Sequence, residues 1–132
     1  EDIQLLNLLE TRTGAHALDV VRSGDGLIFV VESGQMGKAL GKNGQNLIRL
    51  RNDVGKPVDL VESADSLEIF VRNLFRPAEV VSVNVAQEGG KKVSVKVSND
   101  SKGLAIGRSG EKIKRARLLL KKYFDVEDVK IV

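Results

Sequence analysis

Two short stretches of the sequence share a spacing that suits the binding of phosphate groups. Residues 40–47 are LGKNGQNL and residues 106–113 are IGRSGEKI. Each places an aliphatic residue before a Gly-x-x-Gly and another three residues after it. The central pairs, each a cation with a small polar residue, are Lys42-Asn43 and Arg108-Ser109. Glycines let the backbone approach a ligand closely, and a following helix offers unpaired N–H groups and a partial positive charge. Such a loop can hold the phosphate backbone of a nucleic acid.

We assign the phosphate contacts to both loops and to cations beside them. A single Gly-x-x-Gly is more often a plain turn between two helices, because short glycine motifs have many chance matches. Two copies at equivalent places, each with a cation inside, favour binding. The candidate residues are Gly41, Lys42, Asn43, Gly44, Gly107, Arg108, Ser109, Gly110, Lys38, Lys112 and Arg115. The aliphatic residues that flank the loops are expected in the core instead; they are Leu40, Leu47, Ile106 and Ile113.

The equivalence of the two places follows from an internal repeat. A shift of 66 residues lays Gly41 on Gly107 and Gly44 on Gly110 without a gap. The same shift aligns further glycines, aliphatic positions and arginines, among them Gly24 with Gly90, Gly37 with Gly103, Leu47 with Ile113 and Arg49 with Arg115. Two copies are too few for a solenoid, so the sequence predicts two similar small domains in tandem, residues 1–63 and 64–132.

Each copy has the pattern of an α+β domain with the order α-β-β-α-α-β. The expected elements of the first copy are residues 2–13, 17–22, 27–32, 34–40, 44–54 and 57–61. Those of the second are residues 65–75, 79–87, 92–98, 100–106, 110–123 and 129–132. Residues 65–68 (DSLE) are typical of a capping box. Strict alternation in residues 81–85 and 93–97 predicts a three-stranded sheet with one face buried beneath helices and the other in solvent.

Composition excludes several classes of chemistry. The chain of 132 residues has no Cys and a single His, His16, so disulfides, thiolate metal sites, cysteine nucleophiles and paired-histidine metal sites are excluded. We expect His16 to be structural or on the surface, and we expect no metal, no cofactor and no enzymatic activity. A P-loop enzyme is disfavoured because Asn43 follows Lys42 where Ser or Thr is required. The apolar runs are too short to cross a membrane.

Charge is distributed unevenly between the two copies. Residues 1–66 carry seven Lys or Arg and ten Asp or Glu, a net charge of −3, whereas residues 67–132 carry fourteen and eight, a net charge of +6. A basic half indicates a polyanionic partner. Aromatic residues make up only 4% of the chain, too few for a reader that stacks bases on exposed rings.

The residues of the loops also carry a resemblance. IGRSGEKI resembles the I-G-x-x-G-x-x-I signature of KH domains, and LGKNGQNL resembles it with Leu for Ile. With two strands ahead of the loop and one after it, each copy resembles the type II KH arrangement. The tandem, together with SGQMGKALGKNGQNL at residues 33–47, is similar to the paired KH region of NusA transcription termination/antitermination factors, and the length is similar to the short archaeal NusA-like proteins.

This resemblance implies binding of single-stranded RNA, with each loop clamping about four backbone nucleotides, and a role in transcription termination or antitermination. RNA polymerase or the ribosome is implied as a further partner, although no polymerase-binding or S1 domain accompanies the repeat. A cytoplasmic monomer is expected. The alternative is a KH module that binds ribosomal RNA or acts as a ribosome-associated scaffold, because a fold alone does not determine a function.

Overall fold

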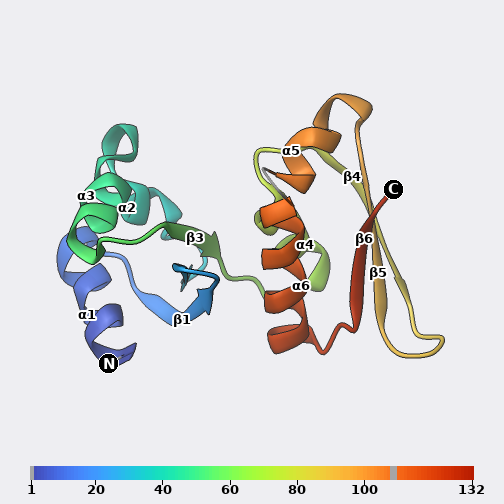
Figure 1. Cartoon of the computed structure of the whole chain (residues 1–132), viewed down its shortest axis with the longest axis horizontal. Helices are drawn as coiled ribbons and strands as arrows, with labels where there is room; N and C mark the ends of the chain where they lie inside the picture. Colours follow the sequence, from blue (N-terminus) through green and yellow to red (C-terminus); the bar gives the residue numbers. More distant parts are fainter. Residues whose placement is uncertain (1, 108–109) are drawn as a thin grey trace. The chain divides into compact units, whose positions relative to one another are not determined.

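The structure, a computed structural model that describes residues 2–107 and 110–132, divides into two compact units (Figure 1). The first unit is residues 1–64 and the second is residues 65–132. Each unit has its own three-stranded sheet and its own helices. No helix within the described residues is long and apolar enough to cross a membrane.

The first unit follows the order expected from its sequence. Its elements are α1 (Asp2–Thr13), β1 (Ala17–Ser23), β2 (Gly26–Val31), α2 (Met36–Leu40), the 3-10 helix η1 (Lys42–Gly44), α3 (Gln45–Val54) and β3 (Val58–Glu62). The helix α3 ends at Gly55, which adopts the left-handed conformation and donates its N–H to the carbonyl of Arg51. Glycine takes this conformation without the steric cost that a Cβ would bring, so α3 ends here.

The second unit repeats the order. Its elements are α4 (Leu67–Phe75), β4 (Val80–Ala86), β5 (Lys92–Val97), the 3-10 helix η2 (Asn99–Ser101), α5 (Lys102–Ile106), α6 (Glu111–Phe124) and β6 (Asp128–Ile131). The N-cap of α4 is Ser66, whose hydroxyl accepts a hydrogen bond from the backbone N–H of Ile69 at 3.3 Å. The capping box expected at residues 65–68 was therefore wrong: Ser66 is the N-cap, and the third helical residue, Ile69, has no side-chain acceptor to complete a box.

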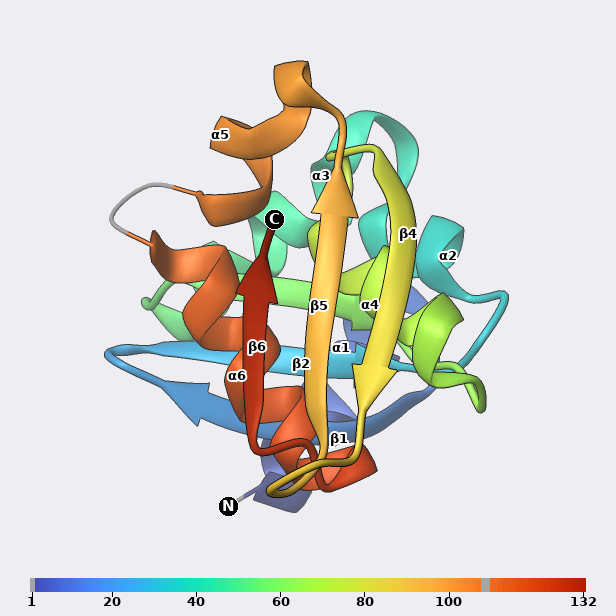
Figure 2. The ribbon, with the colours of Figure 1, turned by 90° about the vertical axis from the view of Figure 1, so that its right-hand side faces the viewer.

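Both sheets have the same topology. In the first, β1 and β2 are antiparallel while β2 and β3 are parallel, and in the second β4, β5 and β6 repeat this arrangement. A parallel pair needs a crossover connection, and here the crossovers are α2 with α3 and α5 with α6. Figure 2 shows the second sheet with α4 and α6 behind it. Each Gly-x-x-Gly therefore lies in the middle of a crossover.

The core of the first unit lies between its sheet and its helices. Leu9 of α1, Phe29 of β2 and Leu50 of α3 are fully buried in one hydrophobic cluster. Half-buried Leu5, Leu6 and Leu47 pack against this cluster. Burial of an aromatic or aliphatic side chain of this size stabilises a fold by about 1.5–3 kcal/mol, so the cluster anchors α3 and, with it, the loop that precedes it.

The second unit buries the expected face of its central strand. Val93, Val95 and Val97 are at most 3% exposed, while the residues between them face away from the core. The alternation expected for residues 81–85 is only partly right, because Val81 and Val85 are 50% and 44% exposed. The pairing of β4 with β5 is irregular between residues 80 and 82, and such an irregularity changes which side chains face the core.

Candidate nucleic-acid interface

The first loop joins the short helix α2 to α3. The N–H of Gly41 ends α2 by donating to the carbonyl of Gly37 at 2.9 Å, and the N–H of Gly44 donates to the carbonyl of Gly41 at 3.1 Å. Gly44 is then the N-cap residue of α3, with no hydrogen bond from a side chain to cap the helix. The first-turn N–H groups of α3 therefore lack a side-chain acceptor, which is a setting that suits an anion.

The first glycine of this loop has a conformation that is nearly restricted to glycine. Gly41 has φ 73° and ψ 177°, in a region that residues with a Cβ essentially do not occupy. A Cβ on Gly41 would also lie 2.6 Å from Cγ of Asn46. Asn46 holds its position by donating from Nδ2 to the carbonyl of Lys38 at 2.9 Å. The loop backbone thus lies directly against α3.

The last two positions of the first loop are left-handed, and the second of them has open space around it. Asn43 and Gly44 are both left-handed, with φ 56° and φ 71°, and asparagine tolerates this conformation better than most residues. A Cβ on Gly44 would meet nothing within 4 Å. This side of the loop is open, so a ligand backbone can approach it.

The second loop repeats the geometry of the first at both glycines. Gly107 has φ 78° and ψ 174°, and Gly110 has φ 73° and ψ 19°. The N–H of Gly107 donates to the carbonyl of Gly103 at 3.0 Å, as Gly41 does to Gly37. Gly110 is the N-cap of α6, again without a side-chain cap. The candidate residues Arg108 and Ser109 lie outside the described residues.

Two of the candidate cations lie on the first loop or next to it. Lys42 is exposed in η1, and Lys38 is exposed in the last turn of α2. Asn43, also exposed, lies between Lys42 and Gly44. Two exposed cations and an exposed polar side chain therefore lie on the first loop or in the helical turn that precedes it.

Two further candidate cations, Lys112 and Arg115, have partners within the fold. Lys112 donates from Nζ to the carbonyl of Arg76 at 2.8 Å, and Arg115 donates to the carbonyl of Leu74. Both carbonyls belong to the C-terminal end of α4, where positive charge is favourable. Lys112 and Arg115 are half-buried. They attach the first turns of α6 to α4, and their contact with RNA stays a prediction.

The aliphatic residues that flank the loops do not all lie in the core. Leu47 packs against the hydrophobic cluster of the first unit, and Leu40 and Ile113 are half-buried. The prediction was wrong for Ile106, which is 44% exposed at the end of α5. This helix has only five residues and buries Ala105, so it cannot bury the next residue as well.

Asn46, a residue of α3 that supports the loop, was missed by sequence reasoning. It supports Gly41 from α3, yet its counterpart under the 66-residue shift is Lys112, so the repeat gave no signal for it. The described residues contain no group of three or more His, Asp or Glu side chains that could hold a metal ion. His16 is exposed, and its Nδ1 lies 2.6 Å from Oε1 of Glu10.

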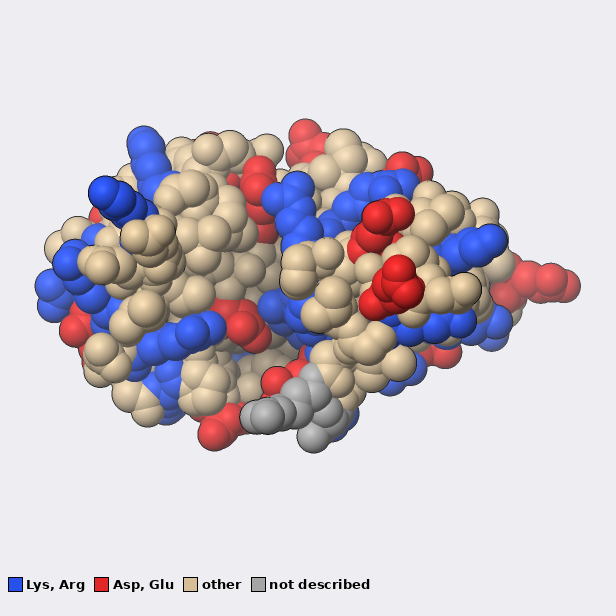
Figure 3. Space-filling view, turned by 90° about the horizontal axis from the view of Figure 1, so that it is seen from above, with Lys and Arg blue, Asp and Glu red and all other residues tan. Residues whose placement is uncertain are grey.

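Positive charge is present on the surface of both units. Figure 3 shows Lys and Arg side chains in several separate areas, with Asp and Glu between them. In the crossover of the first unit, Arg51 donates from Nε to the carbonyl of Val58 at 3.1 Å. In the second unit, Arg117 pairs with Asp128 at 3.3 Å. Basic residues of the helices thus divide between internal contacts and solvent.

Comparison with known proteins agrees with this geometry. The family described as "NusA-like second KH domain" matches residues 67–132, and the family described as "KH domain" matches residues 4–85. The "Probable transcription termination protein NusA" of Halobacterium salinarum is 36% identical over 128 residues, covering 97% of this chain and 92% of that protein. The protein of the same name from Methanococcus vannielii is 34% identical over the whole chain, which covers 77% of it.

A solved structure is similar throughout. The chain described as "Crystal structure of APE1850" is 39% identical, with a TM-score of 0.88, and the match covers 99% of this chain and 97% of that one. The repeated glycine geometry, the family matches and the relatives agree with one another. The chain therefore belongs to the NusA-like family of KH-domain proteins.

Proposed function

We propose that this protein binds single-stranded RNA at its two Gly-x-x-Gly loops and acts in transcription termination or antitermination. Each compact unit corresponds, in this proposal, to one of the two type II KH domains expected at residues 1–63 and 64–132, and the units themselves divide one residue later. The observation that carries the proposal is that both loops have the same backbone conformation at their glycines and lead into helices without a side-chain cap. Relatives named as transcription termination proteins supply the biological role.

The mechanism follows from what each part of the loop offers. The second glycine, Gly44 or Gly110, lets a phosphate approach the N-terminus of the following helix, where the helix dipole favours negative charge. Lys42 adds a charge-assisted contact in the first loop. The bases of a single strand then lie beside the loop and can contact the protein, whereas the bases of a duplex stay stacked and paired with one another.

The contribution of the first loop is tested by reversing its charge. The double variant Lys42→Asp with Asn43→Asp places two carboxylates where phosphates are expected. The matched control, Lys56→Asp with Asn52→Asp, makes the same chemical change at exposed positions beyond the loop in the same unit. Loss of one charged hydrogen bond is worth about 2 kcal/mol, roughly thirtyfold in Kd, so the loop variant weakens RNA binding by at least that much.

The result is interpreted against the control and the fold. Thermal unfolding of both variants checks that the proteins are intact, and titration of a labelled single-stranded RNA measures affinity. An equal loss in the loop variant and the control would show that only net charge matters, and the clamp would be wrong. The matching change in the second unit is Arg108→Asp with Ser109→Asp.

The ligand class is tested by strand state and salt. Single-stranded RNA binds more tightly than a duplex of the same sequence, and log K falls with log salt with a slope of about −3 if roughly four phosphates are neutralised. Preference for duplex or an affinity independent of salt contradicts the proposal. Co-purification from cells separates transcription complexes from ribosomes, and recovery with ribosomes alone would favour the ribosomal-RNA alternative.

A further inference from the structure

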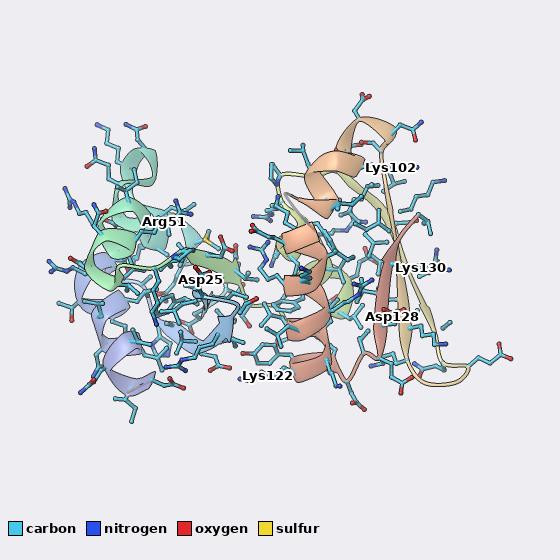
Figure 4. The ribbon with its side chains drawn as sticks, viewed as in Figure 1. Asp25, Arg51, Lys102, Lys122, Asp128 and Lys130 are labelled. Carbon is cyan, nitrogen blue, oxygen red and sulfur yellow. The ribbon has the colours of Figure 1, made fainter. Side chains whose placement is uncertain are left out.

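The outer face of the second sheet, which points away from α4 and α6, carries three lysines. Lys92 and Lys96 are exposed on β5, and Lys130 is exposed on β6. The residues that alternate with them, Val93, Val95 and Val129, are buried. Figure 4 shows Lys130 on the side of β6 away from α6. We call the surface formed by Lys92, Lys96 and Lys130 the lysine face.

The strand register places these lysines close together. Ser94, midway between Lys92 and Lys96, is paired with Lys130. A rise of about 3.3 Å per residue and a strand spacing of about 4.8 Å put the Cα of Lys130 roughly 8 Å from each of the other two. The described residues contain no ion pair to any of the three. The nearest acid by register, Asp128, already pairs with Arg117.

The equivalent positions of the first unit carry no lysine. Under the repeat, the counterparts of Lys92, Ser94 and Lys96 are Gly26, Ile28 and Val30. The residue paired with Ile28 is Asp59, in the place that Lys130 holds opposite Ser94. The two sheets therefore share a register but differ in charge at equivalent positions, so positive charge on this face is not required by the fold.

The neighbours of the lysines favour a phosphate backbone over a protein partner. Across from Lys96 lies Ser82, and across from Ser94 lies Asn84. Lysine, serine and asparagine are side chains that contact phosphate oxygens. A stable protein interface is instead centred on buried aromatic or Arg anchors. The exposed apolar residues on this side of the sheet lie at its margins, with Val81 and Ala86 on the edge strand β4 and Val132 after β6.

We infer that the lysine face of the second unit is an additional contact for the phosphate backbone of RNA that is held at the Gly107–Gly110 loop. The helix α5, which leads into that loop, contacts β6, and β6 is an edge strand of the sheet. RNA that leaves the loop passes the edge at β6 and reaches Lys130 first, then Lys92 and Lys96. This inference rests on the proposed function, because the RNA that reaches the lysine face is the same strand that is held at the loop.

The test is the salt dependence of RNA binding by the full chain. The variant Lys92→Gln, Lys96→Gln, Lys130→Gln removes three cations from the lysine face. The control, Lys56→Gln, Lys121→Gln, Lys122→Gln, removes three cations from exposed positions elsewhere. With a long single-stranded RNA, the first variant lowers the magnitude of the salt slope by about 2, at roughly 0.7 per phosphate, and the control leaves the slope unchanged.

Further measurements distinguish the ways in which this inference could fail. A four-nucleotide RNA, which fills one loop, shows the same slope in all three proteins, and Lys→Arg at the same three positions keeps the wild-type slope. Equal slopes for the two variants on long RNA overturn the lysine face while leaving the loops intact. If the loop variants also bind normally, the proposed function itself fails. Loss of poly-glutamate binding with unchanged RNA binding assigns the face to an acidic protein and overturns the inference.

Discussion

The two glycines of the first loop are predicted to have different roles, one in stability and one in RNA binding. Replacing each glycine with alanine measures the two roles separately. Gly41 has a backbone conformation that costs a residue with a Cβ about 1–3 kcal/mol. The new Cβ would also displace Asn46, 2.6 Å away, and its hydrogen bond to Lys38, worth about 1 kcal/mol. Gly41→Ala therefore lowers the free energy of unfolding of the first unit by about 2–4 kcal/mol.

Gly44→Ala is the comparison within the same loop. Its left-handed conformation costs about 1 kcal/mol with a Cβ, but a Cβ there meets nothing within 4 Å. The smaller loss of stability is accompanied by a larger loss of RNA affinity, because the methyl group occupies the open side where a phosphate approaches. Gly37→Ala, in the helix α2 with free space around it, is the control and stabilises by up to about 1 kcal/mol.

Amide hydrogen exchange of β2 measures the free energy of unfolding of the first unit by itself. Titration of single-stranded RNA, below the temperature at which any variant unfolds, measures affinity. Equal destabilisation by Gly41→Ala and Gly44→Ala would refute the conformational argument. Unchanged RNA affinity in Gly44→Ala would refute the assignment of the open side to the phosphate.

Four further results are expected. Arg115→Gln removes the donor to the Leu74 carbonyl and lowers stability by about 1–3 kcal/mol. If Arg115 also contacts a phosphate, as predicted, the magnitude of the salt slope of RNA binding falls by about 0.7; an unchanged slope contradicts that contact. Ser66→Ala removes the N-cap of α4 and costs about 1 kcal/mol in urea unfolding. Because only residues 63–66 connect β3 to α4, an RNA long enough for both loops binds more tightly than two short RNAs; no gain in affinity with RNA length contradicts this. Charge reversal of the second loop costs more RNA affinity than charge reversal of the first, and equal losses of affinity contradict this asymmetry.

Much of the fold was predictable because local signals repeat. The helix expected at residues 2–13 is α1, and the ranges of the other elements agree to within about two residues, an ordinary disagreement at element ends. The repeat provided two independent copies of each turn and strand, so a weak signal in one copy was supported by the other.

What was missed depends on contacts between elements. The aliphatic side chain of Ile106 predicted a core position, but at the end of the short helix α5 this side chain is exposed. Arg115 stays a predicted phosphate contact, but the hydrogen bond that it donates to the Leu74 carbonyl at the end of α4 was not foreseen. The support of Gly41 by Asn46 requires the packing of a loop on a helix. None of these contacts leaves a periodic pattern in the chain.

The crossover that contains each loop also has a consequence for the order of folding. The parallel partners Leu27 and Val58 in one unit, and Val93 and Val129 in the other, lie roughly 30 residues or more apart along the chain, whereas the hairpins β1–β2 and β4–β5 close locally, and distant contacts form more slowly than local ones. We expect the hairpin of each unit to form early and the parallel strand, with the glycine loop in its crossover, to join late. Substitutions in the loops then act chiefly by accelerating unfolding, since interactions absent from the folding transition state change the unfolding rate. A protein that has lost its loop conformation would fold at nearly its normal rate, but its folded state would have a shorter lifetime.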